Sequence, residues 1–448
     1  MPSNPTSKVA QPLYQGMDFE SIRKCVHCGL CLEACPTYRE SGLEQDSPRG
    51  RLYIMKGLYN NTVEMNEDSA QYLNRCLNCR ACETACPSLV PYSELYEKTI
   101  GLVHDNLRGN SLQDKILSFV FKKILPSNHN LIWLSKLLRV YKKLSLDSLI
   151  KNSRPLQKLL PKSMIKGQYL MPEFAGKSYK QKFSGDHKTQ RVSTKKGTVA
   201  LFTGCVADVS DHEIHDSTMK LLDSAGYDVI IPKEQSCCGA LQVHGGDRES
   251  GREQGKKNIS EFRSLNVENI ITTTAGCSAQ MKDYHHLLDC VNYPKENEEA
   301  LAFEAKVIDI LEFLSRISDF YENTSWIEEP DTIIYDAPCH LLHAQKVDAG
   351  PTALLSALPG VTFVKNIESN FCCGSAGIYN MLQPELSDKI LHRKIESIKT
   401  TLKKYPTVKT ILTGNMGCLY QLKYGVETMG LPELRVMHPV VYMANRLR

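Results

Sequence analysis

Two cysteine runs near the start of the chain have the spacing of iron–sulfur ligands. Both read C-x2-C-x2-C-x3-C-P, from Cys25 to Pro36 and from Cys76 to Pro87. In such runs three closely spaced thiolates bind one cubane, and the fourth, placed before proline, binds the other cluster. The spacing therefore predicts two [4Fe–4S] clusters, the first held by Cys25, Cys28, Cys31 and Cys86 and the second by Cys35, Cys76, Cys79 and Cys82.

Zinc sites and disulfides are the alternatives for so many thiols. Structural zinc sites take four thiolates as two separated pairs, which two identical four-thiolate runs fit poorly. The chain has 448 residues and 17 cysteines, and its first thirty residues lack the apolar core of a signal peptide. We therefore expect a cytoplasmic protein, in which thiols stay reduced and metal or redox chemistry accounts for the cysteines.

The second half of the chain carries another cysteine pattern twice. A single cysteine, a Cys-Cys-Gly turn and a Gly-Cys pair recur at offsets of 134, 135 and 141 residues. The glycine of each turn permits a tight bend that can point both thiolates at one centre. Each repeat could hold a further iron–sulfur cluster, with zinc or buried thiols as alternatives; the residues are Cys205, Cys237, Cys238 and Cys277, then Cys339, Cys372, Cys373 and Cys418.

Three histidines lie close in sequence to these turns. His244 follows the first Cys-Cys-Gly, while His340 and His343 follow Cys339. Imidazoles beside thiolates could move protons or orient cluster sulfurs, although a histidine is more often a structural residue.

Short apolar runs lead into each cysteine landmark, and helical patterns separate them. The expected strands are 198–202, 228–231, 269–273, 332–335, 361–364 and 408–413, and the expected helices include 215–225, 253–265 and 386–403. Alternating strands and helices form parallel sheets, whose sites lie beyond the carboxyl ends of the strands. The cysteines of both repeats should therefore converge at such edges.

Composition divides the chain into four parts. The region 1–110 reads as helical, and 111–196 is a basic helical linker with 19 Lys and Arg against 4 Asp and Glu. The two cysteine-rich repeats span 197–325 and 326–448. We expect an α+β multidomain fold: a helical cluster domain followed by two pseudo-repeated α/β domains with parallel sheets.

The linker alternates leucine-rich stretches with lysines, which is typical of amphipathic helices. These could contact a partner subunit, an anionic membrane face or the acidic domains of the chain itself. The overall net charge of +4 does not indicate nucleic-acid binding.

No G-x-G-x-x-G follows an expected strand, so the sequence indicates no flavin or nicotinamide pocket. One-electron carriers without a hydride acceptor predict a flavin-containing partner subunit. We expect no catalytic acid or base in this chain.

The order of these motifs resembles the iron–sulfur subunit of glycolate oxidase (glycolate dehydrogenase). The resemblance rests on both cysteine runs, on Ser47-Pro48-Arg49-Gly50-Arg51, and on the sequences around Cys205, Cys237, Cys339 and Cys372. It implies an α-helical ferredoxin-type domain and cysteine-rich CCG domains. It also implies an electron-transfer subunit that serves flavin subunits oxidising glycolate or D-lactate, reduces a quinone-type acceptor, and lies in the cytoplasm or against the cytoplasmic face of the inner membrane.

Two related families remain as alternatives. One is the heterodisulfide reductase type, a thiol–disulfide oxidoreductase with five cysteines in each repeat. This chain has Gln280 and Gln421 where the last of those cysteines would fall, which disfavours the five-thiolate cluster. The other is the iron–sulfur subunit of anaerobic glycerol-3-phosphate dehydrogenase.

Overall fold

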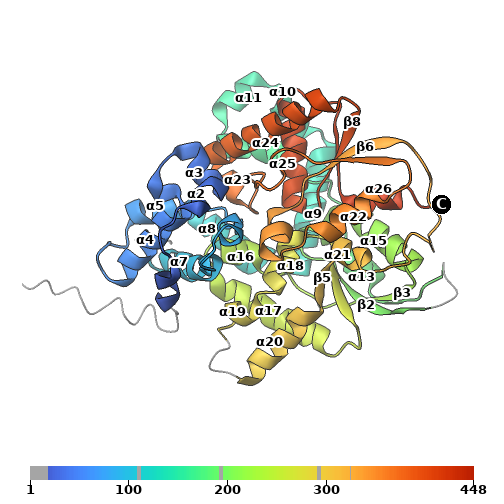
Figure 1. Ribbon diagram of the computed structural model, residues 1–448, viewed down its shortest axis with the longest axis horizontal. Helices are drawn as coiled ribbons and strands as arrows, with labels where there is room; N and C mark the ends of the chain where they lie inside the picture. Colours follow the sequence, from blue (N-terminus) through green and yellow to red (C-terminus); the bar gives the residue numbers. More distant parts are fainter. Residues whose placement is uncertain (1–18, 108–111, 191–194, 290–293, 323) are drawn as a thin grey trace, which may run out of the picture.

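The N-terminal part of the computed structural model is helical, as expected. The structure describes residues 19–448 except 108–111, 191–194, 290–293 and 323. Within this part, the cysteine loops are held by η1 (Phe19–Lys24), α2 (Leu30–Ala34), α3 (Pro36–Ser41), η2 (Glu44–Asp46), α4 (Pro48–Tyr59), α5 (Glu67–Asn74), α6 (Ala81–Thr84) and α7 (Tyr92–Leu107). Apolar residues of α4, α5 and α7 form their common core. These helices gather at one end of the molecule, in blue (Figure 1).

The linker is helical for most of its length and then joins a sheet. Its elements are α8 (Leu112–Phe119), the π-helical turn η3 (Val120–Ile124), α9 (Asn128–Lys143), α10 (Leu146–Asn152), α11 (Arg154–Leu159), α12 (Lys162–Leu170), α13 (Tyr179–Phe183) and β1 (Gly185–His187). Strand β1 pairs antiparallel with β3 (Tyr227–Ile231). The sequence does not predict this strand, because three residues carry too little periodicity to recognise.

Each repeat contains a four-stranded parallel sheet with the same strand order. In repeat 1 the order is β3-β2-β4-β5, and in repeat 2 it is β7-β6-β8-β9. The remaining strands are β2 (Gly197–Phe202), β4 (Asn269–Thr272), β5 (Val307–Asp309), β6 (Asp331–Tyr335), β7 (Val361–Val364), β8 (Val408–Leu412) and β9 (Arg435–Met437). All six expected strands are present, whereas the short β5 and β9 were not anticipated.

Helices join the strands, and each repeat extends its last helix over the other. Repeat 1 contains α14 (Val206–Val209), α15 (His212–Ser224), α16 (Ala240–His244), α17 (Arg248–Arg263), α18 (Ala275–Met281), α19 (Tyr284–Leu287), α20 (Pro294–Lys306) and α21 (Ile310–Ser315). Repeat 2 contains η5 (His340–Ala344), α22 (Ala349–Ser356), α23 (Tyr379–Leu382), α24 (Pro384–Lys404), α25 (Met416–Thr428) and α26 (Pro439–Ala444). Helix α26 packs against α15, and α21 packs against α22.

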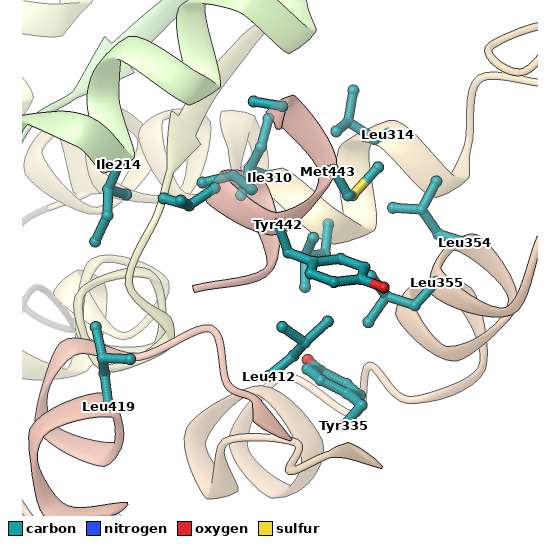
Figure 2. Close-up of a cluster of buried hydrophobic side chains, with 14 of the residues drawn as sticks. Ile214, Ile310, Leu314, Tyr335, Leu354, Leu355, Leu412, Leu419, Tyr442 and Met443 are labelled. Atoms are coloured by element: carbon teal, nitrogen blue, oxygen red, sulfur yellow. The ribbon is translucent and has the colours of Figure 1, made fainter. Parts of the chain in front are cut away.

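This exchange of helices gives the two repeats one shared hydrophobic core. Figure 2 shows Ile214 and Ile310 of repeat 1 in the same cluster as Leu355, Leu412 and Met443 of repeat 2. Burying a side chain of this size stabilises the fold by about 1.5–3 kcal/mol. The shared core fixes the repeats relative to each other, so their cysteine-bearing loops meet.

Candidate metal centres

Four cysteines from both ends of the N-terminal region meet around one cavity. Cys25, Cys28 and Cys31 come from the loop before α2 and from α2 itself, and Cys86 follows α6. These are the four thiols predicted for the first cluster; Cys82 also lines the wall. Cys28 is solvent-exposed.

The second predicted set surrounds a neighbouring cavity. Cys35 comes from the first run, and Cys76, Cys79 and Cys82 come from the second. The buried guanidinium of Arg51 lines this cavity and donates to Thr37 Oγ1 at 3.1 Å. Thr37 Oγ1 in turn lies 3.2 Å from Cys35 Sγ. A cation is therefore held beside four potential thiolates, where it offsets their negative charge.

The cysteines of the two repeats line a single cavity of about 300 Å³. All eight contribute, because the carboxyl ends of the two sheets face one another. The matching loops touch directly: the Gly276 amide donates to Asn415 Oδ1 at 3.0 Å, and the Ala275 amide donates to the Gly414 carbonyl at 3.2 Å. The hydroxyl of Ser375 also lines the cavity and has no hydrogen-bond partner among the described residues.

The donor chemistry of these sets fits iron–sulfur clusters. None of the sixteen cysteines in the described residues forms a disulfide. Nor do three or more His, Cys, Asp or Glu side chains in that part of the chain converge closely enough for a bare metal ion. The thiols instead surround cavities, and the orphaned Ser375 hydroxyl can donate to a cluster sulfur.

The adjacent cysteines of each repeat differ in acidity. Hydrogen bonding with the Cys205 and Cys238 thiols lowers the pKa of Cys237 well below the ordinary thiol value, and the Gly239 amide adds to the effect. Cys339, Cys373 and the Gly374 amide do the same for the pKa of Cys372. Metal ligation requires thiolates, so one ligand of each set is already favoured in its binding form.

A buried lysine lies beside each set, and neither lysine was expected from the sequence. Lys394 of α24 contacts Asp336 at 2.6 Å, three residues before Cys339. In repeat 1, Lys180 comes from linker helix α13 and donates to the Gln235 carbonyl at 2.7 Å, while its backbone amide donates to Asp208. Only the buried acid and the nearby cysteines, brought together by the fold, distinguish these lysines from the many exposed ones.

The three predicted histidines have different surroundings. His244 and His340 line the shared cavity and stack with ring centroids 5.4 Å apart. His343 is a bridging residue: its Nδ1 lies 3.0 Å from Thr84 Oγ1 and its Nε2 lies 2.9 Å from the Asn370 carbonyl. His343 thus ties the N-terminal region to repeat 2.

In repeat 2, the glutamine that stands where a fifth cysteine would fall is part of a hydrogen-bond network. Gln421 is fully buried and donates to Ser387 Oγ at 3.0 Å, while Asn380 donates to its Oε1 at 3.0 Å. Ser387 in turn donates to the Gly374 carbonyl. Gln421 therefore supports the Cys-Cys-Gly turn from behind. Cys290, which belongs to no set, lies outside the described residues.

Shared residues connect the cavities in a row. The two N-terminal cavities have Cys82 and Tyr92 in common. A further cavity of about 380 Å³ shares Cys76 with the second of them, and shares His244 and Ile378 with the eight-cysteine cavity. The cysteine sets thus form one continuous series through the molecule.

Family models match most of this arrangement. Residues 21–90 match a 4Fe-4S dicluster domain, and residues 199–282 and 333–423 match a cysteine-rich domain. Residues 113–169 match the linker region of the glycolate oxidase iron-sulfur subunit.

Curated relatives align along nearly the whole chain. The probable glycolate oxidase iron-sulfur subunit of Bacillus subtilis is 35% identical over 94% of this chain and 93% of its own length. The glycolate oxidase iron-sulfur subunit of Escherichia coli is 28% identical over 89% and 88%. One subunit of the fumarate reductase (CoM/CoB) of Methanothermobacter marburgensis is 24% identical over 94% and 71%. The chain belongs to the family of glycolate oxidase iron–sulfur subunits.

Proposed function

We propose that the chain is the electron-transfer subunit of a flavin-dependent 2-hydroxy-acid dehydrogenase, taking electrons from a flavin partner and serving a quinone-type acceptor. The observation that supports this proposal is the row of adjoining cavities, whose walls include the sixteen cysteines that we predict as ligands. Glycolate is the substrate we propose for the partner, with D-lactate as the second choice.

The ligand assignments follow the cavity linings. Cys25, Cys28, Cys31 and Cys86 hold one [4Fe–4S] cluster, and Cys35, Cys76, Cys79 and Cys82 hold the second. The eight cysteines of the repeats hold one or two further clusters. Bound clusters supply one-electron redox chemistry. The chain's own residues orient the thiolates, exclude water and place Arg51, Lys180 and Lys394 where they offset negative charge.

The exposed end of the series is the proposed docking site of the flavin partner. Cys28 is the exposed thiol there. Large apolar side chains beside it are also exposed: Val26 by 68%, Leu30 by 58% and Leu89 by 73%. A partner that covers this apolar surface would bring its flavin close to the first cysteine set.

The linker is the proposed membrane contact, on the cytoplasmic face. Helix α9 buries Leu131 and Ser135 but exposes Trp133, Leu137 and Val140 at helical spacing, together with Lys136 and Lys143. Exposed aromatic and aliphatic side chains among lysines suit an anionic lipid surface. No helix among the described residues has the length and hydropathy needed to cross a bilayer.

Anaerobic purification with and without the partner subunits tests the function. The chain alone should contain iron and acid-labile sulfide but should not oxidise glycolate, while the complex should reduce the clusters when glycolate is added. Glycolate oxidation by the isolated chain, or material without iron and sulfide, would refute the proposal.

Lipid vesicles test the proposed membrane contact. The complex should float with vesicles that contain anionic phosphatidylglycerol and not with neutral ones, and Leu137→Glu should reduce flotation. Equal flotation of both proteins would show that α9 is not the contact.

A further inference from the structure

The cavity of about 380 Å³ in the middle of the series contains no full cysteine set among the described residues. It lies between α5, α7, α8, α16 and α23, and a single predicted ligand, Cys76, reaches its wall. Its volume lies within the ordinary range of small-molecule sites, roughly 300–1,000 Å³. The cavity is therefore a candidate site for a ligand other than a cluster.

Its position places it between two groups of thiols. On one side Cys76, Leu77 and Asn78 belong both to this cavity and to that of the second cysteine set. On the other side His244 and Ile378 belong both to this cavity and to the eight-cysteine cavity. A molecule bound here would be in contact with the walls of two redox sites.

The lining mixes aromatic and aliphatic groups with as many polar ones, among them the amides of Asn74 and Gln383 and the carboxyl groups of Glu67 and Asp114. The Tyr96 and Tyr379 hydroxyls donate to the Leu73 carbonyl at 3.3 Å and the Arg75 carbonyl at 3.0 Å, so their donors are already engaged. Leu117 and Leu382 add aliphatic surface, and His244 adds an imidazole. Because amide groups on the wall can donate to carbonyl oxygens while the tyrosines and leucines contact a ring, the lining suits a flat aromatic ligand that carries carbonyl oxygens.

We infer that this cavity binds the quinone-type acceptor, in contact with Cys76 on one side and His244 on the other. The inference rests on the proposed function. The bound quinone gains two electrons and two protons and leaves as the hydroquinone. The electrons come from oxidation of the partner's 2-hydroxy acid to the 2-oxo acid, which releases two electrons and two protons. The quinone's protons come from solvent at the rim, where Glu67 is exposed.

Helix α8 gives this site a route from a lipid phase. Leu117 and Asp114 of α8 line the cavity. The other side of the helix exposes Leu112 by 75%, Ile116 by 54% and Phe119 by 57%. An apolar outer face over the cavity suits an acceptor that arrives from a bilayer rather than from water.

Filling the cavity tests the inference. Leu117→Trp and Leu382→Trp, on two different helices, should each weaken binding of a fluorescent alkyl-hydroxyquinoline N-oxide by at least about tenfold. In the complex with its flavin partner, the ratio of menadione reduction to ferricyanide reduction should fall by a similar factor. Binding of the probe should also alter the paramagnetic signal of the cluster at Cys76 in the unsubstituted protein.

One control variant separates this site from general damage. Leu301→Trp, at an exposed position of α20 away from the cavity, should behave like the parent protein. Unchanged probe affinity in both cavity-filling variants would overturn the inference, as would an equal loss of menadione and ferricyanide reduction. If the parent complex reduces neither acceptor, the proposed electron-transfer function has failed instead.

Discussion

The two repeats have the same sheet and the same cysteine pattern, but their surroundings differ. Both repeats contact the N-terminal region, repeat 1 through polar pairs such as Arg80 with Asp283 and repeat 2 through cysteines. Cys79 shares a buried hydrophobic cluster with Cys339 and Cys372. Within the described part of the chain, repeat 1 contributes no cysteine to that cluster. The linker supplies a buried lysine to each repeat, Lys180 to repeat 1 and Lys166 to repeat 2, but repeat 2 also has Lys394 from its own α24.

This difference shows how a duplicated motif acquires two roles. Both repeats position their thiols in the same way, because equivalent strands in each repeat end at equivalent cysteines. Neighbouring elements then decide which copy brings its cysteines against the N-terminal set and which buried lysines lie beside each copy. We therefore expect substitutions at matched positions to have unequal effects.

The substitution with the largest expected effect lies where the N-terminal region meets the cysteines of repeat 2. Cys79→Ser removes a thiol from the second N-terminal set, next to Cys372. Acceptor reduction by the complex should fall by roughly 100-fold or more, because one-electron transfer needs an unbroken series of ligated sites. Stopped-flow absorbance should still show substrate reducing the partner's flavin. Cys290→Ser is the control, and an unchanged rate in Cys79→Ser would disprove a route through this set.

Substituting the buried lysines Lys394 and Lys180 should distinguish the repeats by stability. Lys394→Met leaves the buried Asp336 without its ammonium partner and should cost about 3–5 kcal/mol. Lys180→Met should cost only about 1–2 kcal/mol. Asp208 keeps hydrogen bonds from Ser178 at 2.6 Å and Thr203 at 3.1 Å. Urea unfolding measures both values, and equal losses would contradict the comparison.

The glycines of the two Cys-Cys-Gly turns offer a smaller contrast. Both have positive φ, +87° at Gly239 and +84° at Gly374. A Cβ at Gly374 would lie 2.8 Å from the Ser387 carbonyl oxygen, whereas at Gly239 the nearest atom, the Gly251 carbonyl oxygen, is at 3.1 Å. Gly374→Ala should therefore cost about 3 kcal/mol and Gly239→Ala about half as much. Thermal unfolding of the two variants would show the difference, and a larger loss at Gly239 would contradict it.

The helices exchanged between repeats begin with different caps, which predicts opposite pH effects. Asp309 caps α21 and accepts from the Leu311 amide at 2.9 Å; burial raises its pKa to about 7. The favourable contribution of Asp309 to the free energy of unfolding is complete below pH 3.8 and is lost as pH rises through about 7. His438 caps α26, and burial lowers its pKa to about 4. Its contribution is complete above pH 6.5 and is lost as pH falls through about 4.

Replacing each capping residue with asparagine, which does not titrate, should remove the pH effect of that residue alone. Asp309→Asn should stabilise the protein at pH 8 relative to pH 5 by about 1–2 kcal/mol, and His438→Asn should do the reverse. Urea unfolding at the two pH values measures the change. A shift of the same sign in both variants would show that the caps do not titrate as described.

Local patterns were sufficient for much of the fold. The strands ending before Cys205 and Cys339 were expected because short β-branched runs precede Gly or Pro turns, and α24 was expected from its helical spacing. Three-residue strands such as β1 and β9 were missed, since hydrogen bonds to neighbouring strands define them more than their own residues do. The eight N-terminal cysteines could be sorted into two sets because their spacing is itself the ligand pattern.

The sequence by itself determined the spacing of the thiols in the two N-terminal runs and in the two repeats, and with it the predicted ligand sets, because nearby turns and strand ends position those residues. Only the tertiary structure decided that the eight repeat cysteines share one cavity, that Cys79 faces Cys372, and that Lys180 of the linker serves repeat 1. The physical reason is that these residues lie far apart along the chain. The packing of α26 on α15 and of α21 on α22 brings them together. Hydrophobic packing is not directional, so the spacing of nearby residues does not show which distant segments will pack against each other.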